Sequence, residues 1–160
     1  MPRIGITGHI HLAAQTSVLV RRGLADMLEH YGGDLVGVSC LAPGADTIFA
    51  SVVLASGGKL EVVLPTGRYR DLVVPAELRS LVDELLDGAA TVRVMCYDTP
   101  SPEAYQAANH AVLAMIERLV AVWDGGKGAP GSSADMVASA RMLDIPVDVV
   151  WPVGSRRISK

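Results

Sequence analysis

The chain of 160 residues is short of the residue types that mark several classes of protein. Only 4% of its residues are aromatic, so the stacking platforms of a single-stranded nucleic-acid binder are missing. Its two cysteines, Cys40 and Cys96, have neither the C-x-x-C spacing of a redox or zinc motif nor the number that a disulfide framework needs. We therefore expect a protein of the reducing cytoplasm, with no metal and no bound cofactor.

The chain also lacks an excess of one charge and a long apolar run. Its formal net charge is −3 and its pI is about 5.7, which gives no strong attraction to nucleic acid or to an anionic membrane. No apolar run reaches the ~18 residues of a membrane span, and the N-terminus has no signal-peptide pattern. We expect no membrane contact, and nucleic acid is disfavoured as a partner.

What remains is the composition of an aliphatic core. Half of the residues are hydrophobic, and because so few are aromatic, the core must be built from Val, Leu, Ile and Ala, as in strands buried on both faces. The length predicts one domain. We assign residues 1–153 to that domain and residues 154–160 to a basic tail, which we expect to be solvated.

Short β-branched runs alternate with longer helical patterns along the chain. The runs predict six strands, at residues 3–7, 35–39, 60–64, 91–95, 119–123 and 147–150. The helical patterns predict five helices, at about residues 13–31, 45–56, 75–87, 102–118 and 132–143. This alternation predicts an α/β fold, a Rossmann-like, doubly wound and mainly parallel sheet of about six strands with helices on both faces.

A doubly wound sheet binds its ligand beyond the carboxyl ends of its strands, so the loops after the strands are where a site is expected. Three of these loops are small, bear glycine and open a helix, which suits a phosphate group; ordinary strand-to-helix turns are the alternative. The ligand-binding residues that we predict lie in these loops and after the third strand: Thr7, Gly8, His9, Leu41, Gly44, Ala45, Asp46, Thr66, Arg68, Gly125, Gly131, Ser132 and Ser133.

Two common nucleotide motifs are absent. The dinucleotide fingerprint needs G-x-G-x-x-G after the first strand and an acidic residue at the end of the second. Here the spacing is Gly5-x-x-Gly8, and the second strand ends in Ser39-Cys40. The P-loop pattern is missing too, because Gly126-Lys127-Gly128 lacks its spacing.

The segment GVSCLAPGADTIFASVVLASGGKLEVVLP, residues 37–65, resembles the equivalent part of the DprA/Smf-type and Lonely Guy-type Rossmann-like proteins, the SLOG superfamily. The opening GITGH and the later AVWDGGKGAPGSSADMV fit a small bacterial branch of that group. The resemblance implies binding of a nucleotide or nucleotide-derived ligand. The resemblance also makes N-glycosidic hydrolysis a candidate activity, because some members cleave the N-glycosidic bond of nucleoside monophosphates.

The Lonely Guy enzymes carry a PGGxGTxxE motif at the helix after the fifth strand. Pro130 and Gly131 match it, Ser133 can supply the hydroxyl of the threonine, and Asp135 stands one place before the glutamate. No arginine stands near 108–109, where those enzymes have one, although Tyr105 and Asn109 would share a helix face there.

If the chain is an enzyme, we expect Asp135 and Asp124 to be the catalytic carboxylates, because a carboxylate near the anomeric carbon stabilises an oxocarbenium-like state. Each has a simpler role as an alternative: Asp135 completing a helix start and Asp124 closing a turn. For Asp46 we expect capping or a bond to a ribose hydroxyl, since its charge would repel phosphate. For His9 we weigh a ligand contact against a bond to nearby backbone.

Three functions stay open. A nucleotide-binding or sensing protein comes first, because the arginine is missing and the acid is altered. An N-glycosidic hydrolase, or a deoxyribosyltransferase-like enzyme, is the second, and single-stranded DNA binding is the least favoured. The helix predicted at 102–118 is apolar around much of its circumference, so we also expect a homo-oligomer.

Overall fold

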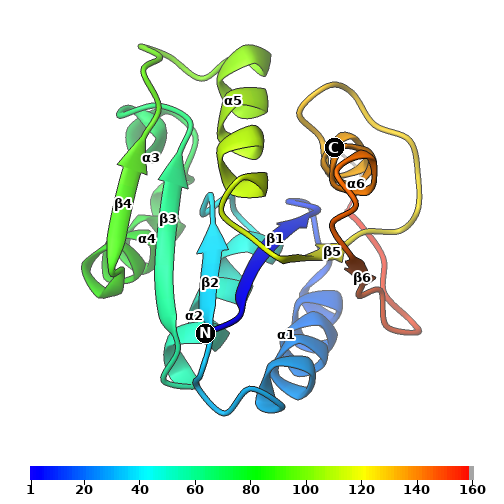
Figure 1. The fold of residues 1–160 in the computed structure, drawn as a ribbon. Coiled ribbons are helices and arrows are strands. Elements are labelled where there is room, and N and C mark those ends of the chain that lie inside the picture. The colour runs from blue at the N-terminus through cyan, green and yellow to red at the C-terminus, as the bar shows by residue number, and fades with distance from the viewer. Residues whose placement is uncertain (159–160) are drawn as a thin grey trace.

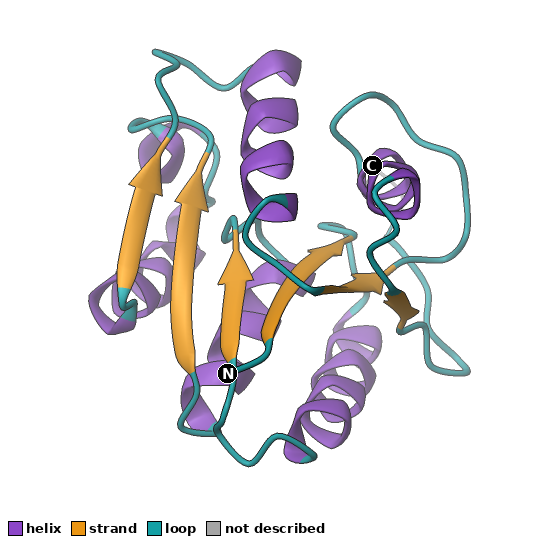
Figure 2. Cartoon of the chain, viewed as in Figure 1, coloured by secondary structure: helices purple, strands orange, loops and turns teal. Residues whose placement is uncertain are grey.

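A computed structural model describes residues 1–158 as a six-stranded parallel sheet with helices on both faces (Figures 1 and 2). The strands are β1 (Arg3–Gly8), β2 (Val36–Ser39), β3 (Lys59–Leu64), β4 (Thr91–Val94), β5 (Arg118–Val122) and β6 (Val147–Val149). The helices are α1 (Ala14–Glu29), α2 (Ala45–Ala55), α3 (Tyr69–Leu72), a 3-10 turn η1 (Ala76–Leu78), α4 (Arg79–Gly88), α5 (Pro102–Leu113) and α6 (Ser133–Met142). The predicted fold class is confirmed.

The strand order is β4-β3-β2-β1-β5-β6, with every neighbouring pair parallel. The chain builds outward from β1 in one direction through β4, and then returns to add β5 and β6 on the other side of β1. The order therefore reverses between β1 and β5, where Gly8 pairs with Val122. In sheets of this kind the connections diverge to opposite faces at such a point and leave a crevice at the carboxyl edge.

Helices α1, α2 and α4 cover one face of the sheet, and α5 and α6 cover the other (Figure 1). Aliphatic side chains fill the space between these layers, as the composition predicted. The one phenylalanine, Phe49 of α2, is fully buried in the cluster that α2 forms with α1, β1 and β5. Each buried aliphatic side chain contributes roughly 1.5–3 kcal/mol to folding.

The glycines of β1 are required by close packing. A side chain at Gly5 would place its Cβ 2.7 Å from Cδ1 of Ile116. A side chain at Gly8 would overlap the Cβ of Ala45 and lie 2.9 Å from the Cβ of Val122. The absence of a Cβ at Gly8 therefore lets the start of α2 reach the end of β1, which places two of the predicted loops side by side.

Most boundaries differ from the prediction by one or two residues, and three differences are larger. The helix predicted at 102–118 ends at Leu113, because residues 114–117 turn into β5, which begins at Arg118. The segment after β3, predicted as a loop, contains the short helix α3. The helix predicted from Pro75 begins as the turn η1 and becomes α-helical only at Arg79.

The segment after β6 folds back onto the body of the protein. Arg157 forms an antiparallel bridge with Leu12, and the Ile158 amide donates to the carbonyl of His11 over 2.8 Å. Arg156, Arg157 and Ile158 stay exposed to solvent while these contacts hold their backbone. The assignment of residues 154–160 to a tail stays a prediction, and Ser159 and Lys160 lie outside the described residues. Within residues 1–158, no helix has the length and apolar character needed to cross a bilayer.

Candidate functional site

A cleft of about 360 Å³ opens at the carboxyl edge of the sheet, around the reversal of strand order. The loops after β1, β2 and β3, the start of α6, one side of α5 and the C-terminal segment all contribute to it. The residues that line it are Thr7, Gly8, His9, Ile10, His11, Cys40, Ala42, Pro43, Asp46, Pro65, Tyr69, Val73, Tyr105, Ala108, Asn109, Gly131, Ser132, Ser133 and Arg157.

The start of α6 forms one wall of the cleft. Ser132 caps the helix, with its Oγ accepting from the Asp135 amide over 3.3 Å, and Oδ2 of Asp135 accepts from the Gly131 amide over 2.9 Å. These reciprocal bonds resemble a capping box and fix the first turn of α6. Asp135 therefore serves the helix start and does not line the cleft. Its predicted catalytic role stays a prediction.

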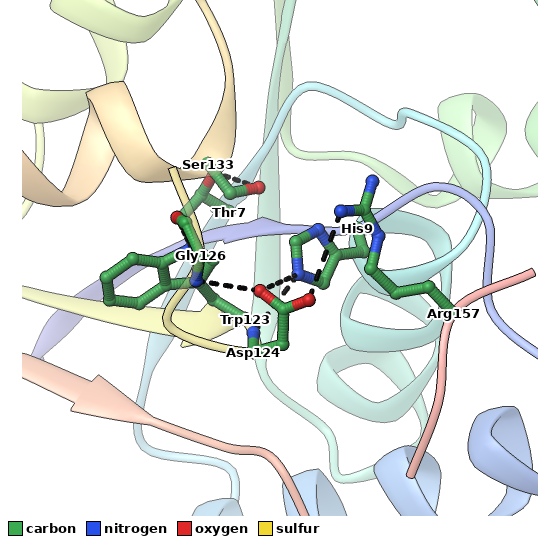
Figure 3. A network of polar contacts seen from close by, with 7 residues as sticks. All are labelled: Thr7, His9, Trp123, Asp124, Gly126, Ser133 and Arg157. Atoms are coloured by element: carbon green, nitrogen blue, oxygen red, sulfur yellow. Dashed lines mark hydrogen bonds and ion pairs between the residues drawn. The ribbon is translucent and has the colours of Figure 1, made fainter. Parts of the chain in front are cut away.

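Two hydroxyl groups meet at this wall. Thr7 at the end of β1 and Ser133 in the first turn of α6 bring their Oγ atoms to 3.4 Å (Figure 3). The first amides of a helix have no partner within the helix. Among the described residues, the amides of Ser133 and Ala134 donate no hydrogen bond. The wall thus presents amide and hydroxyl donors together with the positive end of a helix dipole, which favours an anionic group.

His9, Asp124 and Arg157 form a second group, from three distant parts of the chain (Figure 3). Nε2 of His9 accepts from the Asp124 amide over 3.1 Å and lies 3.2 Å from Oδ1 of the same residue. Oδ1 of Asp124 also accepts from the Gly126 amide over 2.9 Å. Nη1 of Arg157 lies 4.0 Å from the other oxygen, Oδ2. The reversal of strand order creates this group, because His9 follows β1 and Asp124 follows β5.

The charges in this group follow from its surroundings. Burial lowers the pKa of His9, the positive charge of Arg157 lowers it further, and Asp124 opposes both effects. The Gly126 amide bond lowers the pKa of the Asp124 carboxyl, aided by His9 and Arg157. Near neutral pH the imidazole is therefore neutral and the carboxylate ionised. Asp124 itself does not line the cleft, so its catalytic role also stays a prediction.

Asp46 and Tyr69 contribute buried polar groups to the cleft, and Cys40 contributes a partly buried thiol. Asp46 is 6% exposed, and its Oδ2 accepts from the Ala42 amide over 3.3 Å. Burial raises the pKa of Asp46 to about 7, against the effect of that bond. It also raises the pKa of Cys40, with a further rise from Asp46, so the thiol stays protonated and unsuited to nucleophilic attack.

Helix α5 closes the cleft on the remaining side. Tyr105, Ala108 and Asn109 face inward from it, and Nδ2 of Asn109 donates to the Gly131 carbonyl over 3.3 Å. That bond ties α5 to the loop before α6. Tyr105 and Asn109 thus share a side of α5, as their spacing predicted.

Seven of the predicted site residues line the cleft: Thr7, Gly8, His9, Asp46, Gly131, Ser132 and Ser133. Gly44 and Ala45 lie directly behind the lining. The Ala45 amide donates to the His9 carbonyl over 3.3 Å, and a Cβ on Gly44, where φ is +94°, would lie 2.8 Å from that oxygen. The structure thus brings Gly8, Gly44 and Gly131 to one edge of the sheet.

The other predicted ligand-binding residues face elsewhere. Leu41 is fully buried among α2, β3 and α4. Thr66 is also buried, and its Oγ1 accepts from the amide of Arg68, whose side chain is exposed outside the cleft. Gly125 lies in the exposed loop after β5. Near Arg68, the guanidinium of Arg70 donates two hydrogen bonds to Asp83, of 2.6 and 2.8 Å.

Sequence reasoning missed several residues that line the cleft. Arg157 is the most consequential, because it brings a permanent positive charge from a segment that we expected to be solvated. Its position depends on contacts with the loop before α1, which no local pattern encodes. Val73 also lines the cleft, and its four-residue spacing from Tyr69 is the one signal that could have revealed it.

Among residues 1–158, no three His, Cys, Asp or Glu side chains gather closely enough to hold a metal ion. The site has three parts: a donor-rich wall at the start of α6, the His9–Asp124–Arg157 group, and the buried carboxyl of Asp46 beside apolar walls.

No protein-family model matches the chain, and no curated protein matches it significantly. Solved structures do match. DNA processing protein A from Helicobacter pylori, described for its single-stranded DNA binding mode, has a TM-score of 0.71 and 18% identity, covering 98% of this chain and 68% of that one. The same protein from Streptococcus pneumoniae has a TM-score of 0.71 and 21% identity, covering 96% of this chain and 52% of that one, about half its length.

A third similar structure is the molybdenum cofactor binding protein from the phototrophic bacterium Rippkaea orientalis. Its TM-score is 0.63 at 16% identity, covering 94% of this chain and 77% of that one. At these identities the likeness is one of fold. It confirms that this chain shares the Rossmann-like fold of these proteins, as the sequence resemblance implied.

Proposed function

We propose that this protein binds a nucleotide, or a nucleotide-derived phosphate ligand, in the cleft and acts as a binding or sensing protein. One observation carries the proposal: the hydroxyls of Thr7 and Ser133 meet at 3.4 Å beside open amides at the start of α6, inside a cleft. Hydroxyl and amide donors at a helix start are the groups that bind phosphate in other α/β proteins.

The rest of the cleft suits the remainder of such a ligand. Its volume of about 360 Å³ lies in the range of small-molecule sites. Tyr105, Ala108 and Val73 give it apolar walls against which a base can pack. With a pKa near 7, the Asp46 carboxyl is about half protonated at neutral pH. It can therefore donate to or accept from a ribose hydroxyl, and it repels a phosphate less than a full charge would.

Proteins of this fold bind different kinds of ligand. Among proteins of similar structure, one is described as binding single-stranded DNA and another as binding the molybdenum cofactor. For this chain we favour a small ligand, because Arg157 is the only lysine or arginine among the described residues that line the cleft. A strand of nucleic acid normally needs a positively charged groove along its backbone.

A ligand panel tests the proposal. Thermal shift and calorimetry would compare AMP, ADP, a cyclic mononucleotide, adenosine and a thymidine oligonucleotide. We expect at least one mononucleotide to bind and raise the Tm, with adenosine much weaker because it lacks the phosphate. Binding of the oligonucleotide alone would favour the DNA-binding alternative, and no binding by any compound would reject the proposal.

Variants then place the phosphate at α6. Ser133→Ala and Thr7→Val remove the two hydroxyls and should each weaken mononucleotide binding about tenfold, since a hydrogen bond to a charged group contributes roughly 1.5–3 kcal/mol. Ser51→Ala is the matched control, because its hydroxyl bonds to the Thr47 carbonyl within α2 and does not line the cleft. Unchanged affinity in both cleft variants would contradict the assignment.

N-glycosidic hydrolysis is a second candidate function, and the Asp124–His9 pair favours it. Asp124 does not itself line the cleft, but its ionised carboxylate lies 3.2 Å from Nε2 of His9, which does. Its negative charge can therefore stabilise positive charge that develops on a ribose ring in the cleft. Incubation with AMP should then release adenine and ribose 5-phosphate as water adds to the anomeric carbon. Asp124→Asn should abolish that release while AMP still binds. Binding without release in the wild type would leave the protein a binder.

A further inference from the structure

The C-terminal segment is fixed in place by contacts with the loop before α1. The Arg156 amide donates to Oγ1 of Thr16 over 2.8 Å, and that threonine is 1% exposed. The Ala13 amide donates to the Arg156 carbonyl over 3.3 Å, and the Ile158 amide donates to the His11 carbonyl over 2.8 Å. Three hydrogen bonds made by its two neighbours, Arg156 and Ile158, therefore fix the backbone position of Arg157.

Trp151 anchors the start of the same segment. It packs against the core cluster of α1, α2, β1 and β5. Its ring meets that of His9 edge-on, with centroids 5.5 Å apart and planes at 84°. The segment from Trp151 to Ile158 thus runs along the rim of the cleft, attached at each end to the loop that follows β1.

Arg157 reaches the cleft from this segment. Its Nη1 is 4.0 Å from Oδ2 of Asp124, the outer limit of an ion pair, and its side chain is 45% exposed (Figure 3). Asp124 is already bonded to the Gly126 amide and lies beside His9. Within residues 1–158, the guanidinium makes no other side-chain contact of this kind, which leaves most of its five N–H donors open to a ligand.

We propose that Arg157 is the anion-recognising residue of the cleft, carried into the site by the C-terminal segment. The α6 wall offers partial charges and hydroxyls, and Arg157 adds a full positive charge with a planar fork that can hold two phosphate oxygens. The proposal rests on the proposed function and deepens it. A phosphate-bearing ligand is selected over its neutral nucleoside by a residue at the opposite end of the chain from the first cleft loop.

The test measures AMP and adenosine binding by calorimetry in the wild type and three variants. Arg157→Ala should weaken AMP binding roughly 10- to 100-fold and leave adenosine binding unchanged. Arg157→Lys should fall between, because an ammonium keeps the charge but loses the fork. Arg156→Ala is the matched control: its side chain is exposed and does not line the cleft, so AMP should bind as in the wild type.

A second measurement needs no nucleotide. NMR titration of the His9 ring should give a higher pKa in Arg157→Ala than in the wild type, because the positive charge of Arg157 lowers it. Arg156→Ala should change the His9 pKa much less.

The outcomes separate the two proposals. If the wild type binds AMP and Arg157→Ala changes the affinity for AMP by less than twofold, the role of Arg157 is overturned and the proposed function stands. Equal losses of AMP and adenosine binding also overturn it, since they indicate a structural role. If the wild type binds none of the compounds in the ligand panel, the proposed function fails and the role of Arg157 fails with it.

Discussion

At the scale of single residues, Asp46 is a carboxyl of the cleft that changes its charge near neutral pH. Its pKa rises from 3.8 to about 7 because burial disfavours the carboxylate. The folded state then binds a proton between about pH 4 and 7 that the unfolded state has lost. Protonation of Asp46 therefore stabilises the folded state fully below pH 4. This stabilisation is lost as the pH rises through 7, which lowers the free energy of unfolding by up to about 4 kcal/mol.

Asp46→Asn tests this directly. Asparagine has the same shape, can accept from the Ala42 amide, and cannot ionise. We expect the stability advantage of the variant over the wild type to be about 3 kcal/mol larger at pH 8 than at pH 5, measured by urea unfolding. His9 shifts in the opposite direction, so its own contribution grows as the pH rises, and it is present in both proteins.

The difference between wild type and variant therefore isolates Asp46. Asp26→Asn is the control, because Asp26 lies on the exposed side of α1 and its loss should be nearly neutral at both pH values. An Asp46→Asn effect of the same size at pH 5 and pH 8 would contradict the raised pKa.

At the scale of elements, the side chain of Asp135 is one of two that hold the start of α6, together with Ser132. Asp135→Ala removes the acceptor of the Gly131 amide, so we expect a loss of about 1 kcal/mol in the free energy of unfolding. Asp135→Asn keeps an acceptor and should lose less. Chemical denaturation of the three proteins measures both effects. Glu103→Ala is the control, since it is an exposed acid in the first turn of α5 with no recorded side-chain bond.

The same pair of variants separates capping from catalysis. If Asp135 only caps α6, Asp135→Asn should bind AMP as the wild type does. If the protein hydrolyses AMP and Asp135 takes part, adenine release should vanish in a variant that is still folded. A wild-type denaturation curve for Asp135→Ala would contradict the capping role.

Most elements could be predicted because their signals are local. The strands are continuous β-branched runs, and glycine or proline stands near most of their ends. The end of α5 could not be placed, because Ala114 and Met115 are as compatible with a helix as the residues before them. The chain leaves the helix there to enter β5, a tertiary demand that overrides propensity.

The candidate site was predictable to the extent that it consists of loops after strands. Topology alone brings Thr7 beside Ser133 and His9 beside Asp124, once a doubly wound sheet is assumed. Arg157 was not predictable, because its place depends on a bridge to Leu12 and a bond from its neighbour to a buried hydroxyl. Contacts of that kind between the two ends of a chain leave no periodic signal.

At the scale of the whole molecule, the sheet has one exposed side edge with apolar character. All of β4, the outermost strand next to β3, is exposed. Val92 and Val94 are 43% and 46% exposed, and Tyr97 just beyond them is 38% exposed. Edge strands of this kind are usually covered or charged. By contrast, most apolar residues of α5 are buried within the protein and are not available to a second copy. The exposed apolar residues of β4, and not α5, therefore support the expectation of a homo-oligomer.

We therefore expect two copies to associate through β4, and Val94→Lys to separate them. A lysine on the edge strand places an ammonium where the apolar surface would be buried, which disfavours pairing. Light scattering after size-exclusion chromatography, over a range of concentrations, should give a dimer for the wild type and a monomer for the variant. Met142→Lys, at an exposed position of α6, adds the same charge elsewhere and should leave the dimer intact. A monomeric wild type, or a dimer that survives Val94→Lys, would exclude β4 as the interface.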